Sequence, residues 1–182
     1  MEPRWAIFIS GRGSNLQSLL DLKSHQIKVV VSSSQKCLGL FRARRAGVPV
    51  IFFGKNGNWQ ELISQLKQMG VNSIFLLGYM KLVPAELIDA FTPAIYNLHP
   101  SLLPQFPGLD AINLSYQAQG RMGATVHQVT TEMDAGPILL QKVAVTSEER
   151  ESLTLRQAEF LISRVEQQLV EKIFLNPSRG RK

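Results

Sequence analysis

Cysteine is almost absent from this sequence, and long apolar runs are absent altogether. The single cysteine, Cys37, excludes an intrachain disulfide and a zinc site with several cysteine ligands, and it fits a reducing compartment. No stretch approaches the roughly 20 apolar residues that a membrane-spanning helix needs, and the N-terminus carries no signal-peptide pattern. We expect a soluble, cytoplasmic protein without a membrane partner, in which Cys37 is a small buried or half-buried apolar residue.

Length and composition bound the number of domains. The 182 residues are 45% hydrophobic and 19% charged, which is enough to bury one substantial core but too little for two ordinary domains. Internal repeats, low-complexity stretches and linker-like runs are lacking. We expect one domain over residues 1–175 and a polar, basic tail over 176–182, in a monomer or homodimer.

Positive charge exceeds negative charge, with 20 Lys and Arg residues against 14 Asp and Glu residues. An excess of this kind can indicate nucleic-acid binding. However, the basic residues are spread out, and Arg179, Arg181 and Lys182 belong to the tail. The others could attract a small anionic substrate through their summed field; they include Lys23, Lys28, Arg42, Arg44, Arg45, Lys55 and Lys81. We therefore favour small anions over nucleic acid.

Apolar runs alternate with helix-period segments along most of the chain. Strands are expected at 5–9, 27–31, 49–53, 73–77 and 94–97. Helices are expected at 15–22, 38–46, 59–69 and 84–91. A short helix should follow residue 110, then strands at 124–130 and 138–145 and a long helix at 151–174. The pattern predicts an α/β fold: a single Rossmann-like domain with a mostly parallel sheet, helices on both faces, C-terminal strands and a long final helix.

Ligands of open parallel sheets bind at the carboxyl ends of strands, so the candidate loops are 10–14, 78–83 and 97–108. In the first, S-G-R-G-S-N (10–15) turns from a strand into a helix, whose N–H groups and dipole would face an anion. Leu16 stands where a dinucleotide fingerprint has its third glycine, and a P-loop lysine is missing. A monophosphate therefore fits better than a dinucleotide. A plain capped turn without a ligand is an equal alternative.

Asn97, His99 and Asp134 supply an amide, an acid/base and a carboxylate. Residues two apart in an extended segment point to the same side, so Asn97 and His99 would project together from the end of a strand. When an amine attacks a formyl carbonyl, an Asn amide and a His N–H can stabilise the oxyanion, while a carboxylate orients the histidine and helps to relay the proton. Taken alone, a proline-rich loop with a surface histidine and a turn-forming Asp134 are the alternatives.

His127 and Thr125 share a face of a predicted strand, from which they could support the site behind the residues that contact the substrate. A core or edge histidine without catalytic duty is the alternative. A zinc site of His99, His127 and Asp134 would have no closely spaced ligand pair, so we expect no metal.

Five segments, in this order, carry a family resemblance. They are G-R-G-S-N (11–15), L-L-G-Y-M-K-L-V (76–83), Y-N-L-H-P-S-L-L-P-Q-F-P-G-L (96–109), G-A-T-V-H (123–127) and D-A-G-P-I-L-L-Q (134–141). From about residue 5 to 145, the chain resembles the folate-dependent formyltransferases, most closely those that formylate glycinamide ribonucleotide. The resemblance implies that 10-formyltetrahydrofolate is the co-substrate, that its formyl group passes to the amine of glycinamide ribonucleotide in purine biosynthesis, and that no metal takes part.

The resemblance also implies roles for individual residues. Asn97, His99 and Asp134 match the family's catalytic residues, and Gly13, Ser14 and Asn15 match its phosphate-binding loop. The folate-binding positions are Met80, Lys81, Leu82, Val83, Thr131, Glu132, Met133 and Asp134. Lys81 replaces a usual arginine, which keeps the charge but loses the planar, bidentate geometry.

The chain departs from the family's pattern at two places. S-S-S-Q (32–35) stands where S-N-R or similar is usual, near the ribose. In the final helix, Leu161 and Ile162 occupy the positions of a Glu-His pair whose glutamate would bind the ribose hydroxyls. Glu159 and Glu166 lie on the opposite flank of the expected apolar stripe from Leu161, so neither replaces that glutamate. Another amine acceptor, a formyltetrahydrofolate hydrolase and a folate-binding protein without activity are the alternatives.

Overall fold

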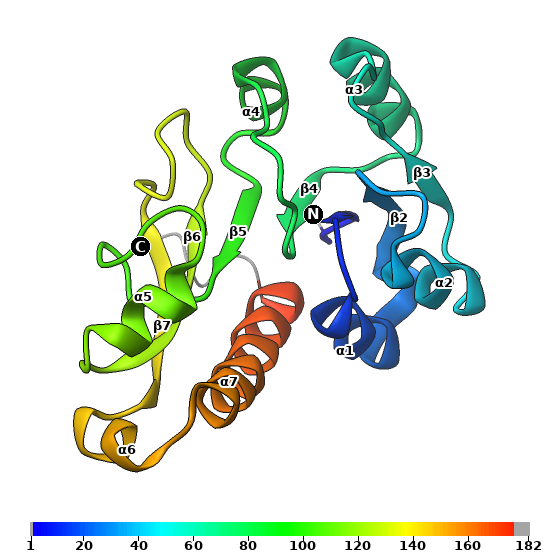
Figure 1. The fold of residues 1–182 in the computed structure, drawn as a ribbon. Coiled ribbons are helices and arrows are strands. Elements are labelled where there is room, and N and C mark those ends of the chain that lie inside the picture. Colours follow the sequence, from blue (N-terminus) through cyan, green and yellow to red (C-terminus); the bar gives the residue numbers. More distant parts are fainter. Residues whose placement is uncertain (1, 177–182) are drawn as a thin grey trace. The chain divides into compact units, whose positions relative to one another are not determined.

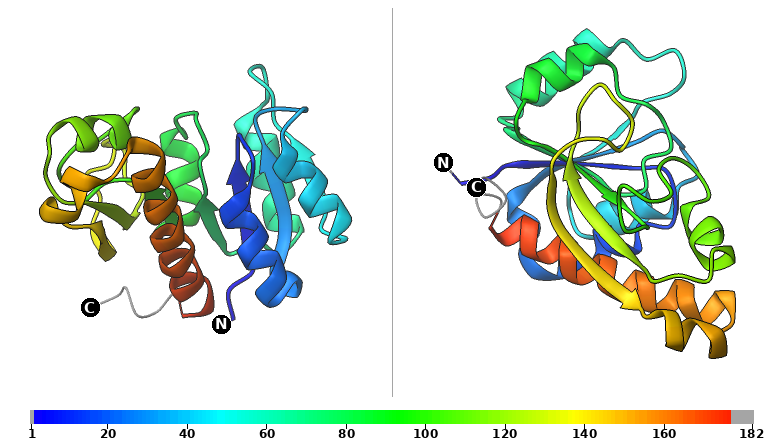
Figure 2. Two further views of the ribbon diagram at one scale, coloured as in Figure 1. Left: turned by 60° about the horizontal axis from the view of Figure 1, so that its bottom comes forward. Right: turned by 90° about the vertical axis from the view of Figure 1, so that its left-hand side faces the viewer.

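The structure is a computed structural model that describes residues 2–176 and is drawn as ribbons in Figures 1 and 2. The chain forms two compact units and passes from the first to the second between Asn97 and Leu98. Within residues 2–176, no helix is long and apolar enough to cross a membrane. The predicted tail residues 177–182 lie outside the described part of the chain.

The first unit is built on parallel strands. These are β1 (Trp5–Ile9), β2 (Ile27–Ser32), β3 (Val50–Phe52), β4 (Ser73–Leu76) and β5 (Ile95–His99), whose last two residues belong to the second unit. They pair in parallel in the order β3-β2-β1-β4-β5. Every residue of β1 is buried. A parallel strand covered on both faces reads as a continuous apolar run, and this is why the sequence located β1 correctly.

The helices of the first unit lie on both faces of its strands, as Figures 1 and 2 show. Helices α1 (Ser14–Lys23) and α2 (Leu38–Arg45) lie on one face, and α3 (Trp59–Gln68) and α4 (Ala85–Phe91) lie on the other. A 3₁₀ turn, η1 (Ser24–Gln26), follows α1. The start of α3 is fixed by Asn58, whose side chain accepts hydrogen bonds from the N–H groups of Gln60 and Glu61.

The second unit contains an antiparallel strand pair and three helices. The strands are β6 (Met122–Gln128) and β7 (Ile138–Val145), and the helices are α5 (Ala111–Gln117), α6 (Ser147–Ser152) and α7 (Leu155–Leu175). Helix α7 packs on the strand pair through a core made of Met122, Val145, Ala158 and Ile162. The α/β fold with mostly parallel strands is thereby confirmed.

The predicted long final helix is α7, which begins at Leu155 instead of residue 151 and is preceded by the separate helix α6. The two helices are separated by Leu153 and Thr154, which both have an extended backbone. Each helix begins with a capping box, in which Thr146 pairs with Glu149 and Thr154 pairs with Gln157. These boxes satisfy N–H groups at each helix start, and residues 147–152 contain no apolar side chain that would extend the buried stripe of α7. The T-x-x-E and T-x-x-Q patterns were the sequence signal for this break.

Candidate active site

Strand β5 carries Asn97 and His99 at its carboxyl end. His99 is its last residue and is only 4% exposed, while Asn97 is half-buried. By strand alternation, residues 97 and 99 lie on the same side of β5. Pro100 follows and holds His99 to an extended backbone.

Asp134 lies between β6 and β7 with a φ of 52°, in the left-handed region. Its Oδ2 accepts the Gly108 N–H at 2.8 Å and lies 3.4 Å from His99 Nδ1. Its Oδ1 lies 3.4 Å from His127 Nε2. The structure therefore brings His99, His127 and Asp134 together around one carboxylate that is only 10% exposed.

Each of the two imidazoles is held at its other nitrogen by a backbone carbonyl. His99 Nε2 lies 2.8 Å from the Phe106 carbonyl oxygen, and His127 Nδ1 lies 2.9 Å from that of Gln128. A carbonyl oxygen only accepts, so each of these nitrogens carries the ring hydrogen and donates it. The remaining nitrogen of each ring faces Asp134, where a second proton would meet a negative charge.

The electrostatics of Asp134 favour its ionised form. Burial raises the pKa of this carboxyl group, but several contacts outweigh burial and lower the pKa to about 2. They are the hydrogen bond to the His127 side chain, the Gly108 N–H bond and the nearby charges of His99 and His127. A carboxylate that stays charged can orient an imidazole and stabilise its protonated form.

Thr125 was predicted to support the site. Its hydroxyl bonds to the loop after β5 and not to Asp134. Its hydroxyl donates to the Ser101 carbonyl at 2.6 Å and accepts the Leu103 N–H at 3.2 Å. Farther along the same loop, Ser101 Oγ donates to the Gln105 carbonyl at 2.6 Å. This loop then supplies the Phe106 carbonyl and the Gly108 N–H that bind His99 and Asp134.

In the first unit, the predicted anion loop turns at Gly13, which has a φ of 70°, and α1 starts at Ser14. The turn lies against the start of α2. A Cβ on Gly13 would meet the Gly39 backbone, and the Gly39 N–H donates to the Gly11 carbonyl at 3.2 Å. Two glycines are thus needed where two backbone segments approach closely.

Two side chains of the α2 region fix the same turn. Cys37 is buried, as expected, and its thiol donates to the Gly11 carbonyl at 2.8 Å. Arg42 donates to the Arg12 carbonyl at 3.0 Å and to Gln17 Oε1 at 2.9 Å. The sequence did not reveal these contacts, because they join residues that are 25 to 30 positions apart.

Large apolar side chains are exposed at the predicted folate-binding positions. In the first unit, Met80 and Leu82 are 70% and 75% exposed in the loop after β4, where the Met80 N–H donates to Ser10 Oγ at 2.9 Å. In the second unit, Met133 and the nearby Leu109 are 58% and 78% exposed. Exposed apolar groups of this size are suited to contact an aromatic ligand.

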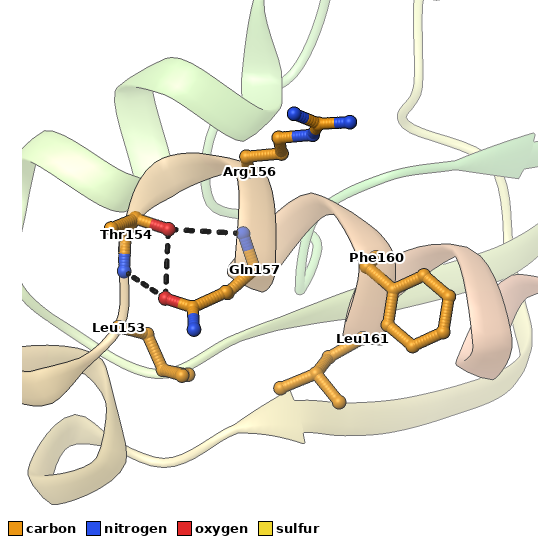
Figure 3. A pocket seen from close by; sticks show the side chains of 6 residues that line it. All are labelled: Leu153, Thr154, Arg156, Gln157, Phe160 and Leu161. Atoms are coloured by element: carbon orange, nitrogen blue, oxygen red, sulfur yellow. Dashed lines mark hydrogen bonds between the residues drawn. The ribbon is translucent and has the colours of Figure 1, made fainter.

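Leu161 and Ile162 differ in their surroundings. Ile162 is buried in the core under α7, whereas Leu161 lines a hollow of about 420 Å³. Figure 3 shows Leu153 and Leu161 pointing into this hollow, below the Thr154–Gln157 capping box, with Phe160 at its edge. Its lining contains Arg156 and no carboxylate.

His99, His127 and Asp134 carry side chains of the types that bind metal ions. Within residues 2–176, no group of three or more His, Cys, Asp or Glu side chains is arranged to hold a metal ion.

Comparison with known proteins identifies the class. The model of the formyl transferase family matches residues 3–168. The phosphoribosylglycinamide formyltransferase of Bacillus subtilis is 35% identical over 162 residues, which cover 82% of this chain and 83% of the relative. The chloroplastic phosphoribosylglycinamide formyltransferase of Vigna unguiculata is 34% identical over 92% of this chain, which spans only 61% of that relative's length.

A solved structure supports the same assignment. Glycinamide ribonucleotide transformylase 1 from Symbiobacterium toebii has a TM-score of 0.86 and 33% identity, covering 99% of this chain and 89% of that one. The chain therefore belongs to the formyl transferase family, and within it to the phosphoribosylglycinamide formyltransferases.

Proposed function

We propose that this protein transfers the formyl group of 10-formyltetrahydrofolate to the amine of glycinamide ribonucleotide, a step of purine biosynthesis. The observation that carries this proposal is the buried pairing of His99 with Asp134, at 3.4 Å, in a member of this family. The predicted substrates are small molecules rather than nucleic acid, and the chain would act as a cytoplasmic monomer or homodimer.

The reaction makes one C–N bond and breaks another. The substrate amine attacks the formyl carbon, negative charge develops on the formyl oxygen, and the folate N10 leaves with a proton as the attacking nitrogen loses one. We assign the oxyanion to the Asn97 amide and to the His99 Nε2–H, which would exchange its bond to the Phe106 carbonyl for one to the oxyanion when the substrates bind. Asp134 would orient His99 and help to relay the proton through water.

His127 would support this arrangement from behind Asp134. Its Nε2 lies 3.4 Å from Asp134 Oδ1, while Oδ2 faces His99, so each carboxylate oxygen has its own imidazole. This placement fixes the rotation of the carboxylate and therefore the direction in which His99 is held.

The predicted substrate-binding residues fall into two groups. Gly13, Ser14 and Asn15 would bind the nucleotide's phosphate at the start of α1, where helix N–H groups lack intrahelical acceptors. The folate-binding positions would be those given by the resemblance, in the loop after β4 and in residues 131–134. The exposed Met80, Leu82 and Met133 are compatible with an aromatic pterin or benzoyl group.

One assay tests the function and its alternatives. The purified protein is incubated with 10-formyltetrahydrofolate, with and without glycinamide ribonucleotide, and the appearance of tetrahydrofolate is followed. Release that requires the ribonucleotide is expected. Release without any amine would make the protein a hydrolase, and release only with a different amine would change the acceptor. No release under any of these conditions would refute an enzymatic function.

A further inference from the structure

We infer that Gln141 is a positioning residue for His99 and Asp134, acting through the loop of residues 101–108. The inference rests on the proposed function and concerns a residue that touches neither the reacting atoms nor the catalytic pair. Gln141 lies on β7 opposite Thr125 of β6, and both side chains reach the beginning of this loop.

The hydrogen bonds of Gln141 require an amide nitrogen. Its Nε2 donates to the Leu103 carbonyl at 2.9 Å and to Thr125 Oγ1 at 2.8 Å. The hydroxyl hydrogen of Thr125 is already given to the Ser101 carbonyl at 2.6 Å. The hydroxyl can therefore only accept from Gln141, and an oxygen at this place would face two acceptors.

The far end of the same loop holds the catalytic pair. The Phe106 carbonyl accepts from His99 Nε2 at 2.8 Å, and the Gly108 N–H donates to Asp134 Oδ2 at 2.8 Å. Phe106 has a φ of 54°, which is unfavourable for an aromatic residue. Surrounding contacts must therefore hold the carbonyl in this direction, and those of Gln141 and Thr125 fix the start of the loop.

Two substitutions at Gln141 separate the role of its hydrogens from its bulk. Gln141→Met keeps the length of the side chain and removes both N–H donors. Gln141→Glu keeps the shape and sets an oxygen against the Leu103 carbonyl. Lys142→Ala is the matched control, because Lys142 is the next residue and its Nζ bonds to Gln168 of α7 instead of the loop.

Steady-state kinetics with both substrates gives the first readout. For Gln141→Met and Gln141→Glu we expect kcat to fall by about 10- to 100-fold, because small displacements of catalytic groups have effects of this size. The KM values should change by no more than about threefold, since Gln141 bonds to Leu103 and Thr125 and to none of the predicted substrate-binding residues. Lys142→Ala should keep kcat within about twofold.

Thr125 provides a rescue test. Thr125→Ser keeps the hydroxyl and should retain most of kcat, whereas Thr125→Val removes it at similar volume and should resemble Gln141→Met. If these residues only stabilised the fold, their substitution would lower the melting temperature but would not lower kcat selectively at an unchanged KM.

A second readout does not need activity. The His99 Nε2–H proton, donated to the Phe106 carbonyl, should give a downfield proton resonance that is protected from exchange in the wild type and in Lys142→Ala. In Gln141→Met it should broaden or exchange faster, because the loop that carries the Phe106 carbonyl has lost its bond at Leu103.

The outcomes are separable from those for the proposed function. If the wild type is active and both Gln141 variants keep kcat within twofold, the inference is wrong while the function stands. If the wild type is inactive, the function is wrong, and an unchanged His99 resonance in Gln141→Met would refute the inference independently. If Gln141→Met does not fold, Gln141→Glu decides, and failure of both to fold would make Gln141 a folding residue and refute the inference.

Discussion

Replacing Asp134 with asparagine removes one negative charge from the carboxylate between His99 and His127 and leaves the side-chain shape nearly unchanged. The Gly108 N–H bond and the two imidazole contacts, at 2.8 Å and 3.4 Å, are then made to a neutral amide. The variant therefore isolates the charge of Asp134 as the quantity under test.

The size of the effect follows from the pKa of Asp134, which is lowered from 3.8 to about 2. Burial acts in the opposite direction and is outweighed by the hydrogen bonds to His127 and Gly108 and by the imidazole charges. A shift of nearly two units corresponds to ~2.5 kcal/mol of stability. The side chain is 10% exposed, so solvent screens the interaction little.

The free energy of unfolding should depend on pH in the direction expected for a carboxyl group whose pKa is lower in the folded than in the unfolded state. As the pH falls, the unfolded chain takes up this proton first, so stability is fully present above about pH 5 and is lost on the way to about pH 2. The asparagine side chain does not titrate, so the variant lacks this pH-dependent contribution to stability. The free energy of unfolding of the wild type minus that of the variant should therefore decrease by about 2 kcal/mol over this range.

Urea unfolding followed by circular dichroism, at a series of pH values between about 2 and 6, measures this difference. Other carboxylates titrate in both proteins and cancel in the subtraction. A difference that stays constant with pH would refute the reasoning, because it would mean that the carboxylate is not preferentially ionised in the folded state.

Two further substitutions test the site. His99→Ala should lower kcat by roughly two to four orders of magnitude with folate affinity largely retained, and kinetics with a binding titration checks this; a nearly unchanged kcat would contradict the role of His99. Gly136→Ala places a Cβ against the Gln128 carbonyl oxygen, so it should destabilise the fold by about 1–3 kcal/mol in urea unfolding. Gly120→Ala, which meets nothing within 4 Å, is its control, and equal stability of the two variants would be the contrary result.

Strand positions were the most predictable part of the structure. The predicted bounds 5–9 and 138–145 agree with β1 (Trp5–Ile9) and β7 (Ile138–Val145). For β1, an uninterrupted apolar run indicates a strand buried on both faces. The helix starts at Ser147 and Leu155 were missed because residues 147–152 contain no apolar side chain whose period could mark a separate helix, and each capping box depends on two polar side chains.

Local strand geometry also made part of the candidate site predictable. Asn97 and His99 lie two apart in one strand, so local geometry alone turns them to the same side. The pairing of His99 with Asp134 agreed with the sequence-based prediction. The roles of these residues and of the binding loops stay predictions that the variants above test.

By itself, the sequence determined the alternation of strands and helices, the family resemblance and the types of side chain available for formyl transfer. Only the tertiary structure decided that His127 shares the carboxylate of Asp134, that Phe106 and Gly108 hold the pair, and that Gln141 fastens their loop. Local periodicity reports burial along one element, whereas these contacts depend on chain segments that folding brings together and that leave no period in the sequence.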